Sequence, residues 1–288
     1  MNKLKTQYDC KEILENGEFS TIFRVASVSD DKEVALKVYN YDCSVFRREH
    51  RAFQALGRHE NVVGFKEHIS VYPEQVLVLE LCQMDLRQYI DDHNGRIEEK
   101  DRKILLRQLF NGLQHIHSNG YVHLDIKTQN LLIIGKTLKI ADFGLATKVP
   151  ADEEDSRNEQ QVSLWYRPIE IALGEKKFDY SADMWSAGCV MAELITGEPI
   201  FKVYTDIELI NRIIETIGSP DASIAPEIGK LPIMKYITLR EQPINKLRDA
   251  LPNISDKEYD LINNLLCYNV KTRLTSAQAG SHSYFENE

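Results

Sequence analysis

Two short segments, around residues 125 and 142, hold the side chains best suited to chemistry. Asp125 can accept a proton from a hydroxyl group, and Lys127 can neutralise the charge of a phosphate group. Asn130 and Asp142 carry the hard oxygen ligands that Mg²⁺ prefers. Together these residue types meet the requirements of phosphoryl transfer, in which a base, metal ligands and cations surround the transferred group.

The order and spacing of these residues resemble the catalytic and metal loops of eukaryotic protein kinases. The first segment reads H-x-D-x-K-x-x-N from His123 to Asn130, and the second reads D-F-G from Asp142 to Gly144. The resemblance implies that Asp125 is the catalytic base, and that Asn130 and Asp142 hold Mg²⁺ against ATP. A lone D-F-G matches by chance, whereas the ordered pair of motifs does not. The alternative, polar residues that only cap buried loops, is therefore disfavoured.

The resemblance also implies that a lysine and a glutamate lie upstream. Lys37 follows Ala35-Leu36 in a strand-like segment, where a kinase lysine would hold the α- and β-phosphates of ATP. Glu49 stands in the one helical pattern of the first eighty or so residues. Glu49 alone could be a solvated charge on that helix. With Lys37 placed, the ion pair between Lys37 and Glu49 is favoured.

The phosphate-binding loop departs from the kinase pattern. Kinases usually carry G-x-G-x-x-G, because glycine lets the backbone approach the phosphates closely. Here Glu15 and Ser20 replace the outer glycines, and only Gly17 remains. Side chains at these positions stiffen the loop, and Glu15 and Glu18 add negative charge near ATP. We therefore expect weaker nucleotide binding than in relatives with all three glycines, but not its loss.

Similarity along the cleft assigns an adenine pocket. Leu79 occupies the gatekeeper position between the pocket and the core. The same residues are also core residues in part, because an adenine pocket resembles a core with one layer removed. The expected contacts are Leu14, Ile22 and Ala35 above the base, Leu132 beneath it, Glu80 and Cys82 at the hinge, and Asp85 at the ribose.

The segment Leu164–Glu170 resembles the end of the activation segment in cyclin-dependent kinases, with Pro-Ile-Glu in place of Ala-Pro-Glu. A short insert after Phe201 also resembles that group, and the overall resemblance runs from about Tyr8 to Phe285. It implies a serine/threonine kinase that acts on protein substrates with proline after the target residue. The residues assigned by this resemblance are Ser163 beside the catalytic base, Arg167 at the proline pocket, a Glu170–Arg273 pair that stabilises the fold, and Asp183 as an anchor of the catalytic loop.

Three positions lack the residues that bind an activating phosphate in those relatives. Leu124 replaces the arginine before the catalytic base, Thr147 replaces a second basic residue, and Asn158 replaces the phosphothreonine. Only Arg48 remains of the arginines that would clamp the phosphate. We hypothesise that activation does not require phosphorylation of this loop. The acidic residues 152–155 could supply charge to Arg48, although a solvated acidic loop is the more ordinary interpretation.

The elements that must position these residues fall into two groups. Residues up to about 82 are rich in β-branched and aromatic segments, with strands expected at 8–14, 21–27, 33–39 and 76–81. Helical spacing dominates afterwards, with helices expected at 86–90, 101–117, 182–196, 206–217 and 257–266. We predict an α+β fold and one bilobal kinase domain over residues 1–288, with an N-lobe to about 82, a C-lobe from about 83, and an activation segment at about 142–170.

Composition restricts the setting and the partners. The net charge of −9 and the absence of a long basic run argue against nucleic acid as a partner. The five cysteines are dispersed, which suits reduced thiols inside the cell, in the nucleus or cytoplasm. No apolar run could serve as a signal peptide or span a membrane.

A partner and a competing function stay open. A cyclin-like activator is expected at residues 45–49, although the aromatic residue there could equally belong to the core. The alternative to catalysis is a pseudokinase that binds or scaffolds other proteins. The degraded phosphate loop and Leu124 favour that alternative, whereas the intact set of Lys37, Glu49, Asp125, Lys127, Asn130 and Asp142 favours an enzyme.

Overall fold

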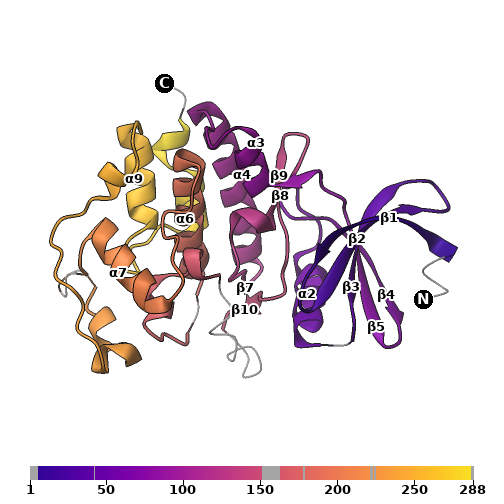
Figure 1. Ribbon diagram of the computed structural model, residues 1–288, viewed down its shortest axis with the longest axis horizontal. Coiled ribbons are helices and arrows are strands. Elements are labelled where there is room, and N and C mark those ends of the chain that lie inside the picture. Colours follow the sequence, from indigo (N-terminus) through magenta and orange to yellow (C-terminus); the bar gives the residue numbers. More distant parts are fainter. Residues whose placement is uncertain are drawn as a thin grey trace.

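A computed structural model describes residues 6–41, 43–150, 163–177, 179–220, 223 and 225–286. It has a strand-rich small lobe and a helix-rich large lobe, which lie side by side in Figure 1. The predicted α+β fold is confirmed. Of the predicted activation-segment residues, Asn158 and the acidic residues 152–155 lie outside the described part of the chain.

The small lobe is built on a five-stranded antiparallel sheet with the order β1-β2-β3-β5-β4. Strand β4 was not predicted from the sequence. It lies at the edge of the sheet and none of its side chains is fully buried, so its sequence lacks a clear apolar alternation. The strands are β1 Tyr8–Asn16, β2 Ser20–Ser27, β3 Glu33–Tyr39, β4 Phe65–Val71 and β5 Glu74–Leu79.

Helix α2, Ser44–Leu56, packs against this sheet. Phe46, Glu49, Phe53 and Leu56 recur at helical spacing and are buried, so one face of the helix points to the core. The ring of Phe46 is only 5% exposed and lies edge-on to Tyr39. Of the two interpretations left open for this aromatic residue, core packing is therefore the one that the structure supports.

The large lobe surrounds helix α6, Ser181–Thr196, which is buried continuously from Ala182 to Leu194. Its Trp185 is fully buried and stacks with Phe201. Helices α4 and α9 pack against α6, and α7 contacts α5. Nearly all the predicted helices lie within one or two residues of their observed bounds. The helices are α3 Leu86–Asp92, α4 Glu99–Ser118, α5 Ile169–Ala172, α6, α7 Asp206–Ile217, α8 Leu247–Ala250, α9 Asp256–Leu265 and α10 Ser276–Gly280.

Short elements at the junction of the lobes carry the predicted catalytic segments. Strands β6 Met84–Asp85, β8 Leu131–Ile134 and β9 Thr137–Ile140 form one small sheet, and β7 Tyr121–Val122 pairs with β10 Thr147–Lys148. The 3-10 turns η1, Thr128–Asn130, and η3, Leu164–Tyr166, lie in the catalytic loop and at the end of the activation segment. The site is thus assembled from short turns that the large lobe holds in place.

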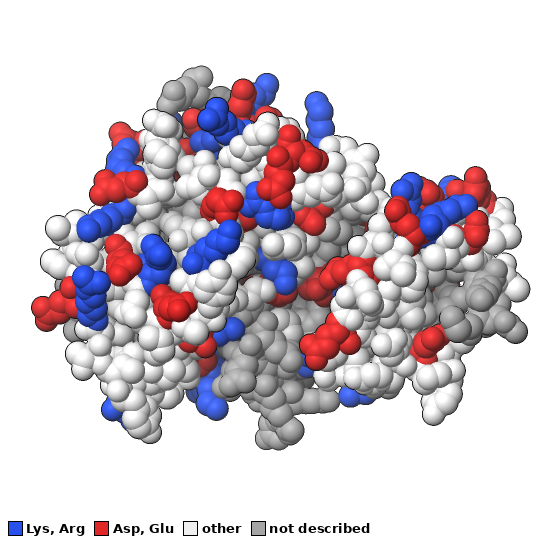
Figure 2. Space-filling model, viewed as in Figure 1, with Lys and Arg blue, Asp and Glu red and all other residues white. Residues whose placement is uncertain are grey.

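The surface is charged and mixed. On the face shown in Figure 2, acidic and basic side chains are interspersed, and no extended basic patch is visible there. No helix in the described ranges is both long enough and apolar enough to cross a membrane. All five cysteines belong to the described residues, and each is a free thiol.

Candidate active site

A cavity of about 410 Å³ lies where the small lobe meets the large lobe. A neighbouring hollow of about 560 Å³ shares Asp85, Asn130 and Asp142 with it and adds Lys127 and Ser163. The nucleotide-pocket residues predicted from the sequence therefore line one continuous region. Those that line the first cavity are Leu14, Gly17, Ile22, Ala35, Lys37, Glu49, Leu79, Glu80, Cys82, Asp85, Asn130, Leu132 and Asp142.

Lys37 is the cationic centre of this cavity. Its Nζ lies 2.7 Å from Glu49 Oε2 and 2.8 Å from Asp142 Oδ1, so the expected ion pair is present and includes a second carboxylate. Burial lowers the pKa of Lys37, but Asp142 and Glu49 outweigh this effect and raise it well above its ordinary value. Lys37 is therefore a permanent ammonium at the floor of the cavity. Tyr39, which the sequence analysis missed, also donates its hydroxyl hydrogen to Glu49.

Asp125 is held by three donors. Ser163 Oγ donates to Asp125 Oδ1 over 2.7 Å, while Lys127 Nζ and Asn130 Nδ2 donate to Oδ2, each over 2.8 Å. Lys127 Nζ also contacts Ser163 Oγ at 3.1 Å. These bonds fix the orientation of the Asp125 carboxylate beside the hollow, where a base acting on a hydroxyl group must stand.

The predicted metal ligands, Asn130 and Asp142, line the cavity and are chemically suitable. Asn130 donates its amide hydrogens to Asp125, which leaves its amide oxygen as an acceptor. The side chain of Asp142 is 43% exposed to the cavity region. Burial raises the pKa of Asp142, but Lys37 outweighs it and lowers the pKa to about 2. An ionised carboxylate and an amide oxygen on one cavity wall fit a hard divalent cation.

The backbone around the catalytic loop is fixed by Asp183 at the start of α6. Its carboxylate accepts from the N–H groups of His123 and Leu124, each at 2.8 Å, and from His117 Nε2 at 2.8 Å. Leu124 has a φ of 65°, a left-handed conformation that costs energy for a residue other than glycine. The bond to Asp183 offsets that cost one residue before Asp125. His117 was not singled out from the sequence.

The end of the activation segment is tied to the large lobe. Arg273 donates to both oxygens of Glu170, at 2.7 and 3.1 Å, and this pair is buried. Arg167 Nη1 lies 2.5 Å from Asp206 Oδ1 at the start of α7. Both contacts hold the end of the activation segment on the large lobe.

Residues 8–285 of the chain match the family model of the protein kinase domain. The chain belongs to the protein kinase family. It is similar to Cyclin-dependent kinase 11.1 of Caenorhabditis elegans, with 33% identity over 98% of this chain and 41% of that protein. It is 31% identical to Cyclin-dependent kinase 11B of Rattus norvegicus over 97% of this chain and 66% of that protein, and 34% identical to Cyclin-dependent kinase 11 of Dictyostelium discoideum over 79% and 64%. The chain is thus similar to proteins named cyclin-dependent kinases, and it spans less than two thirds of the length of each of these three relatives.

Other nucleotide-pocket residues of this kinase domain have additional contacts. Asp85 Oδ1 accepts from the Gln88 N–H and so caps helix α3, while the residue still lines the cavity. The N–H of Glu80 donates to the Gly64 carbonyl, and its carboxylate accepts from the Gly64 N–H and lies 3.1 Å from Lys139 Nζ. Leu14 is about half exposed at the cavity mouth.

The departures from the kinase pattern have a structural counterpart. Leu124 is buried in an apolar cluster with Val122, Ile171 and Ala182, and Leu145, Val149 and Tyr180 pack against them. Thr147 is also buried, and its hydroxyl donates to the Leu145 carbonyl. Arg48 donates through Nε to the Gly144 carbonyl at 2.8 Å. Apolar contact therefore joins the catalytic loop and the activation segment at positions where the resemblance leads one to expect arginine.

The phosphate loop runs over the cavity with acidic side chains beside it. Glu15, Gly17, Glu18 and Ser20 all line the cavity. A Cβ added at Gly17 would lie 3.3 Å from the Ser20 carbonyl oxygen, so the turn is tight at the one glycine that remains. Both glutamates thus lie at the cavity, and the weaker nucleotide binding expected from their charge stays a prediction.

Proposed function

We propose that this chain transfers the γ-phosphoryl group of ATP to serine or threonine hydroxyl groups of proteins. The observation that supports the proposal most strongly is the convergence of Lys37, Asp125, Lys127, Asn130 and Asp142 on one cavity region. A scaffolding protein needs none of these groups in this arrangement, so the geometry favours the enzyme over the pseudokinase.

Each residue has a definite part in the proposed reaction. Asp125 accepts the proton of the substrate hydroxyl group. The hydroxyl oxygen of the substrate forms a bond to the γ-phosphorus while the bond from that phosphorus to the leaving ADP breaks. Lys127 neutralises charge on the transferred group, and Lys37 holds the α- and β-phosphates. Asn130 and Asp142 would hold Mg²⁺, which when bound neutralises the phosphate oxygens. Ser163 keeps Asp125 and Lys127 in register through the two bonds described above.

Substrate preference follows from the activation segment. We infer that the residue after the target serine or threonine is proline, and that Arg167, directly after η3, shapes its pocket. The Arg167–Asp206 ion pair supports this role because it restricts the guanidinium to one position. Protein substrates, rather than small molecules, suit a site that lies open at the junction of two lobes.

Activation is proposed to be independent of phosphorylation in the activation loop. A buried arginine cluster without its phosphate would be costly, because like charges would lie unneutralised away from water. This chain has the Leu124 cluster instead, and the one retained arginine, Arg48, is bonded to Gly144. The apolar cluster joins the same two segments without a modification.

We also propose that a cyclin-like activator docks on α2, which the names of the relatives support. We further propose that the protein resides in the nucleus or cytoplasm. The chain spans 41%, 66% and 64% of the three relatives compared, so the substrates and partners of the full-length protein are included in the proposal.

A phosphotransfer assay tests the function. Wild-type protein and Asp125→Asn are compared on a Ser-Pro peptide and on its Ser-Ala counterpart, with and without candidate cyclins. We expect phosphorylation by the wild type only, with preference for Ser-Pro, and a loss of at least about 10²-fold in Asp125→Asn. Equal inactivity of both proteins, with nucleotide binding retained, would instead support the scaffolding function.

A further inference from the structure

Glu193, near the end of α6, is a fully buried carboxylate that serves two separate segments of the site. Its Oε2 accepts from the Tyr166 hydroxyl at 2.6 Å, and its Oε1 accepts from the Thr128 hydroxyl at 3.2 Å. The two hydroxyl groups also lie 3.1 Å apart. One side chain therefore joins the turns η1 and η3 to the central helix.

Both turns are adjacent to residues with proposed roles in the reaction. Thr128 follows Lys127 directly and lies two residues before Asn130, and Tyr166 lies between Ser163 and Arg167. A shift of η3 relative to η1 would separate Ser163 from Lys127 and Asp125, which are now bonded at 3.1 and 2.7 Å. Such shifts matter, because misplacement by about 1 Å can reduce catalysis by about 10²-fold.

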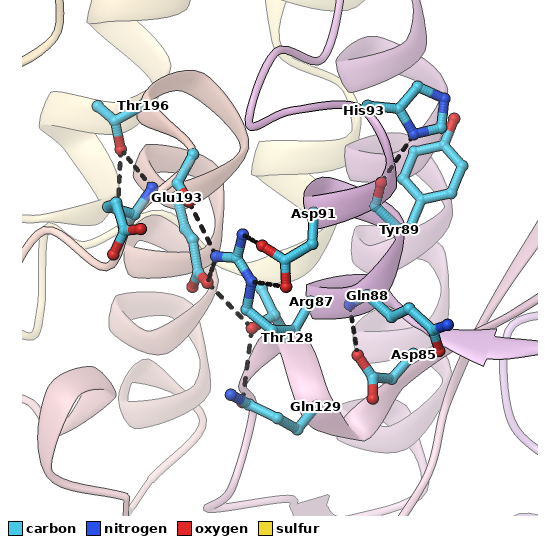
Figure 3. A network of polar contacts seen from close by, with 12 residues as sticks. Asp85, Arg87, Gln88, Tyr89, Asp91, His93, Thr128, Gln129, Glu193 and Thr196 are labelled. Carbon is cyan, nitrogen blue, oxygen red and sulfur yellow. Dashed lines mark hydrogen bonds and ion pairs between the residues drawn. The ribbon is translucent and has the colours of Figure 1, made fainter.

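Arg87 of α3 supplies the cation that a buried carboxylate requires. Its Nη1 lies 2.6 Å from Glu193 Oε1 and donates to the Gly197 carbonyl at 2.9 Å, while Nη2 lies 2.6 Å from Asp91 Oδ1. Figure 3 shows the guanidinium between the Asp91 and Glu193 carboxylates, with the Thr128 side chain close to Glu193. The Glu193 carboxylate is thus bound by Arg87, Tyr166 and Thr128 together.

We propose that Tyr166, Thr128 and Glu193 form a positioning network that keeps the peptide-binding end of the activation segment in register with the catalytic loop. The inference rests on the proposed kinase activity. It assigns no direct contact with the substrate to these residues. Loss of the network lowers the efficiency with which a protein substrate is phosphorylated, and it leaves nucleotide binding unchanged because Lys37 and the cavity walls stay in place.

The chain contains a matched control elsewhere in the large lobe. Tyr284 donates its hydroxyl hydrogen to buried Glu258 at 3.0 Å, and Glu258 is paired with Arg102 through two bonds of 2.8 Å. This Arg–Glu–Tyr set links α4 and α9 to the end of the chain and contributes no residue to the cavity region. Tyr166→Phe and Tyr284→Phe therefore remove the same kind of buried bond from two different places.

Steady-state kinetics on a Ser-Pro peptide compare the two variants with the wild type. We expect Tyr166→Phe to lower kcat/KM for the peptide about tenfold, with KM for ATP unchanged, and Tyr284→Phe to keep wild-type kinetics. Both should lose similar thermal stability. Equal kcat/KM in Tyr166→Phe and Tyr284→Phe would overturn the inference.

A second pair of variants, at Thr128, tests whether the effect of Tyr166→Phe is only a loss of folding. Thr128→Val removes the hydroxyl and should lower kcat/KM, whereas Thr128→Ser retains it and should not. The double variant Tyr166→Phe/Thr128→Val should lose less than the product of the single losses, because both act through Glu193. Multiplicative losses, or equal losses in Thr128→Val and Thr128→Ser, would contradict the network.

Hydrogen exchange tests the positioning network without an activity measurement. The Tyr166 N–H donates to the Ser163 carbonyl and the Asn130 N–H to the Lys127 carbonyl. Tyr166→Phe should speed exchange at both amides, and Tyr284→Phe at neither. If the wild type and Tyr284→Phe phosphorylate no peptide, the proposed kinase activity is wrong, and exchange alone then supports or overturns the positioning role.

Discussion

At the scale of single residues, the buried ion pair between Glu170 and Arg273 is a contact whose loss should be costly. Arg273 also lies over the Trp185 ring, 5.1 Å from its centroid, and donates to the Ser181 carbonyl. Removal of the carboxylate would leave a buried guanidinium without its counter-charge, which typically costs about 3–5 kcal/mol.

We therefore expect Glu170→Ala to lower the free energy of unfolding by about 3–5 kcal/mol. The exposed pair between Arg240 and Glu215, 3.2 Å apart, provides a control, since Glu215→Ala should cost less than about 1 kcal/mol. Urea denaturation of both variants measures the difference. Similar small losses in the two variants would show that the buried pair is not needed for stability.

Local spacing could place residues of one motif, and the resemblance to kinases could place distant pairs such as Glu170 and Arg273, but the sequence could not place distant pairs that lie outside those motifs. Asp125, Lys127 and Asn130 lie in one loop, so their spacing alone predicted a common site. Glu193 and Tyr166 are 27 residues apart and Arg102 and Glu258 are 156 apart. Nothing in the local pattern of such residues distinguishes a buried network from an ordinary polar helix surface.

At the scale of elements, the phosphate loop combines a tight turn with two acidic residues, Glu15 and Glu18, that line the cavity. Restoring the outer glycines in the double variant Glu15→Gly/Ser20→Gly should increase nucleotide affinity several-fold, because it removes one negative charge and frees the backbone. A fluorescent-nucleotide titration measures the change. Asp9→Gly, on the same strand but bonded to Lys11 outside the cavity, should have no effect. Unchanged or weaker binding in the double variant would refute the assigned cause.

The seam between α2 and β4 contains two histidines whose rings are in contact at a tilt of 48°. The rings of His50 and His68 lie 4.6 Å apart, and His50 also packs against Phe46 and Phe65. Burial, and then the neighbouring His68, lower the pKa of His50 below its ordinary value of 6.5. The unfolded chain therefore takes up a proton at higher pH than the folded protein does, so stability is lost as the pH falls below about 6.5.

His50→Gln should reduce this acid sensitivity. We expect the fall in Tm between about pH 7.5 and about pH 5.5 to be smaller in His50→Gln than in the wild type. His93→Gln serves as a control because His93 is exposed at the end of α3. An unchanged fall in His50→Gln would show that other groups cause the acid sensitivity. Sequence alone gave no sign of this seam, since β4 itself was not predicted.

At the scale of the whole molecule, the Leu124 cluster joins β7, β10, α5 and α6 around the catalytic loop. Phosphatase treatment should leave kcat unchanged if this apolar cluster holds the active arrangement. Leu124→Ala should cost about 2–5 kcal/mol and also lower kcat. Leu261→Ala, in the buried face of α9, should cost similar stability but leave kcat unchanged. Loss of activity after phosphatase treatment would refute the hypothesis.

The arrangement of the aromatic residues also determines what an optical experiment can see. Both tryptophans of the chain belong to the large lobe, Trp185 in the core of α6 and Trp165 in η3, where its indole N–H donates to the Val203 carbonyl. Tryptophan emission therefore reports on the large lobe and not on the small lobe, whereas circular dichroism also detects the strands of the small lobe. Melting curves that coincide for the two signals would indicate that the lobes unfold together, and separated curves would reveal a nucleotide-binding half that loosens first.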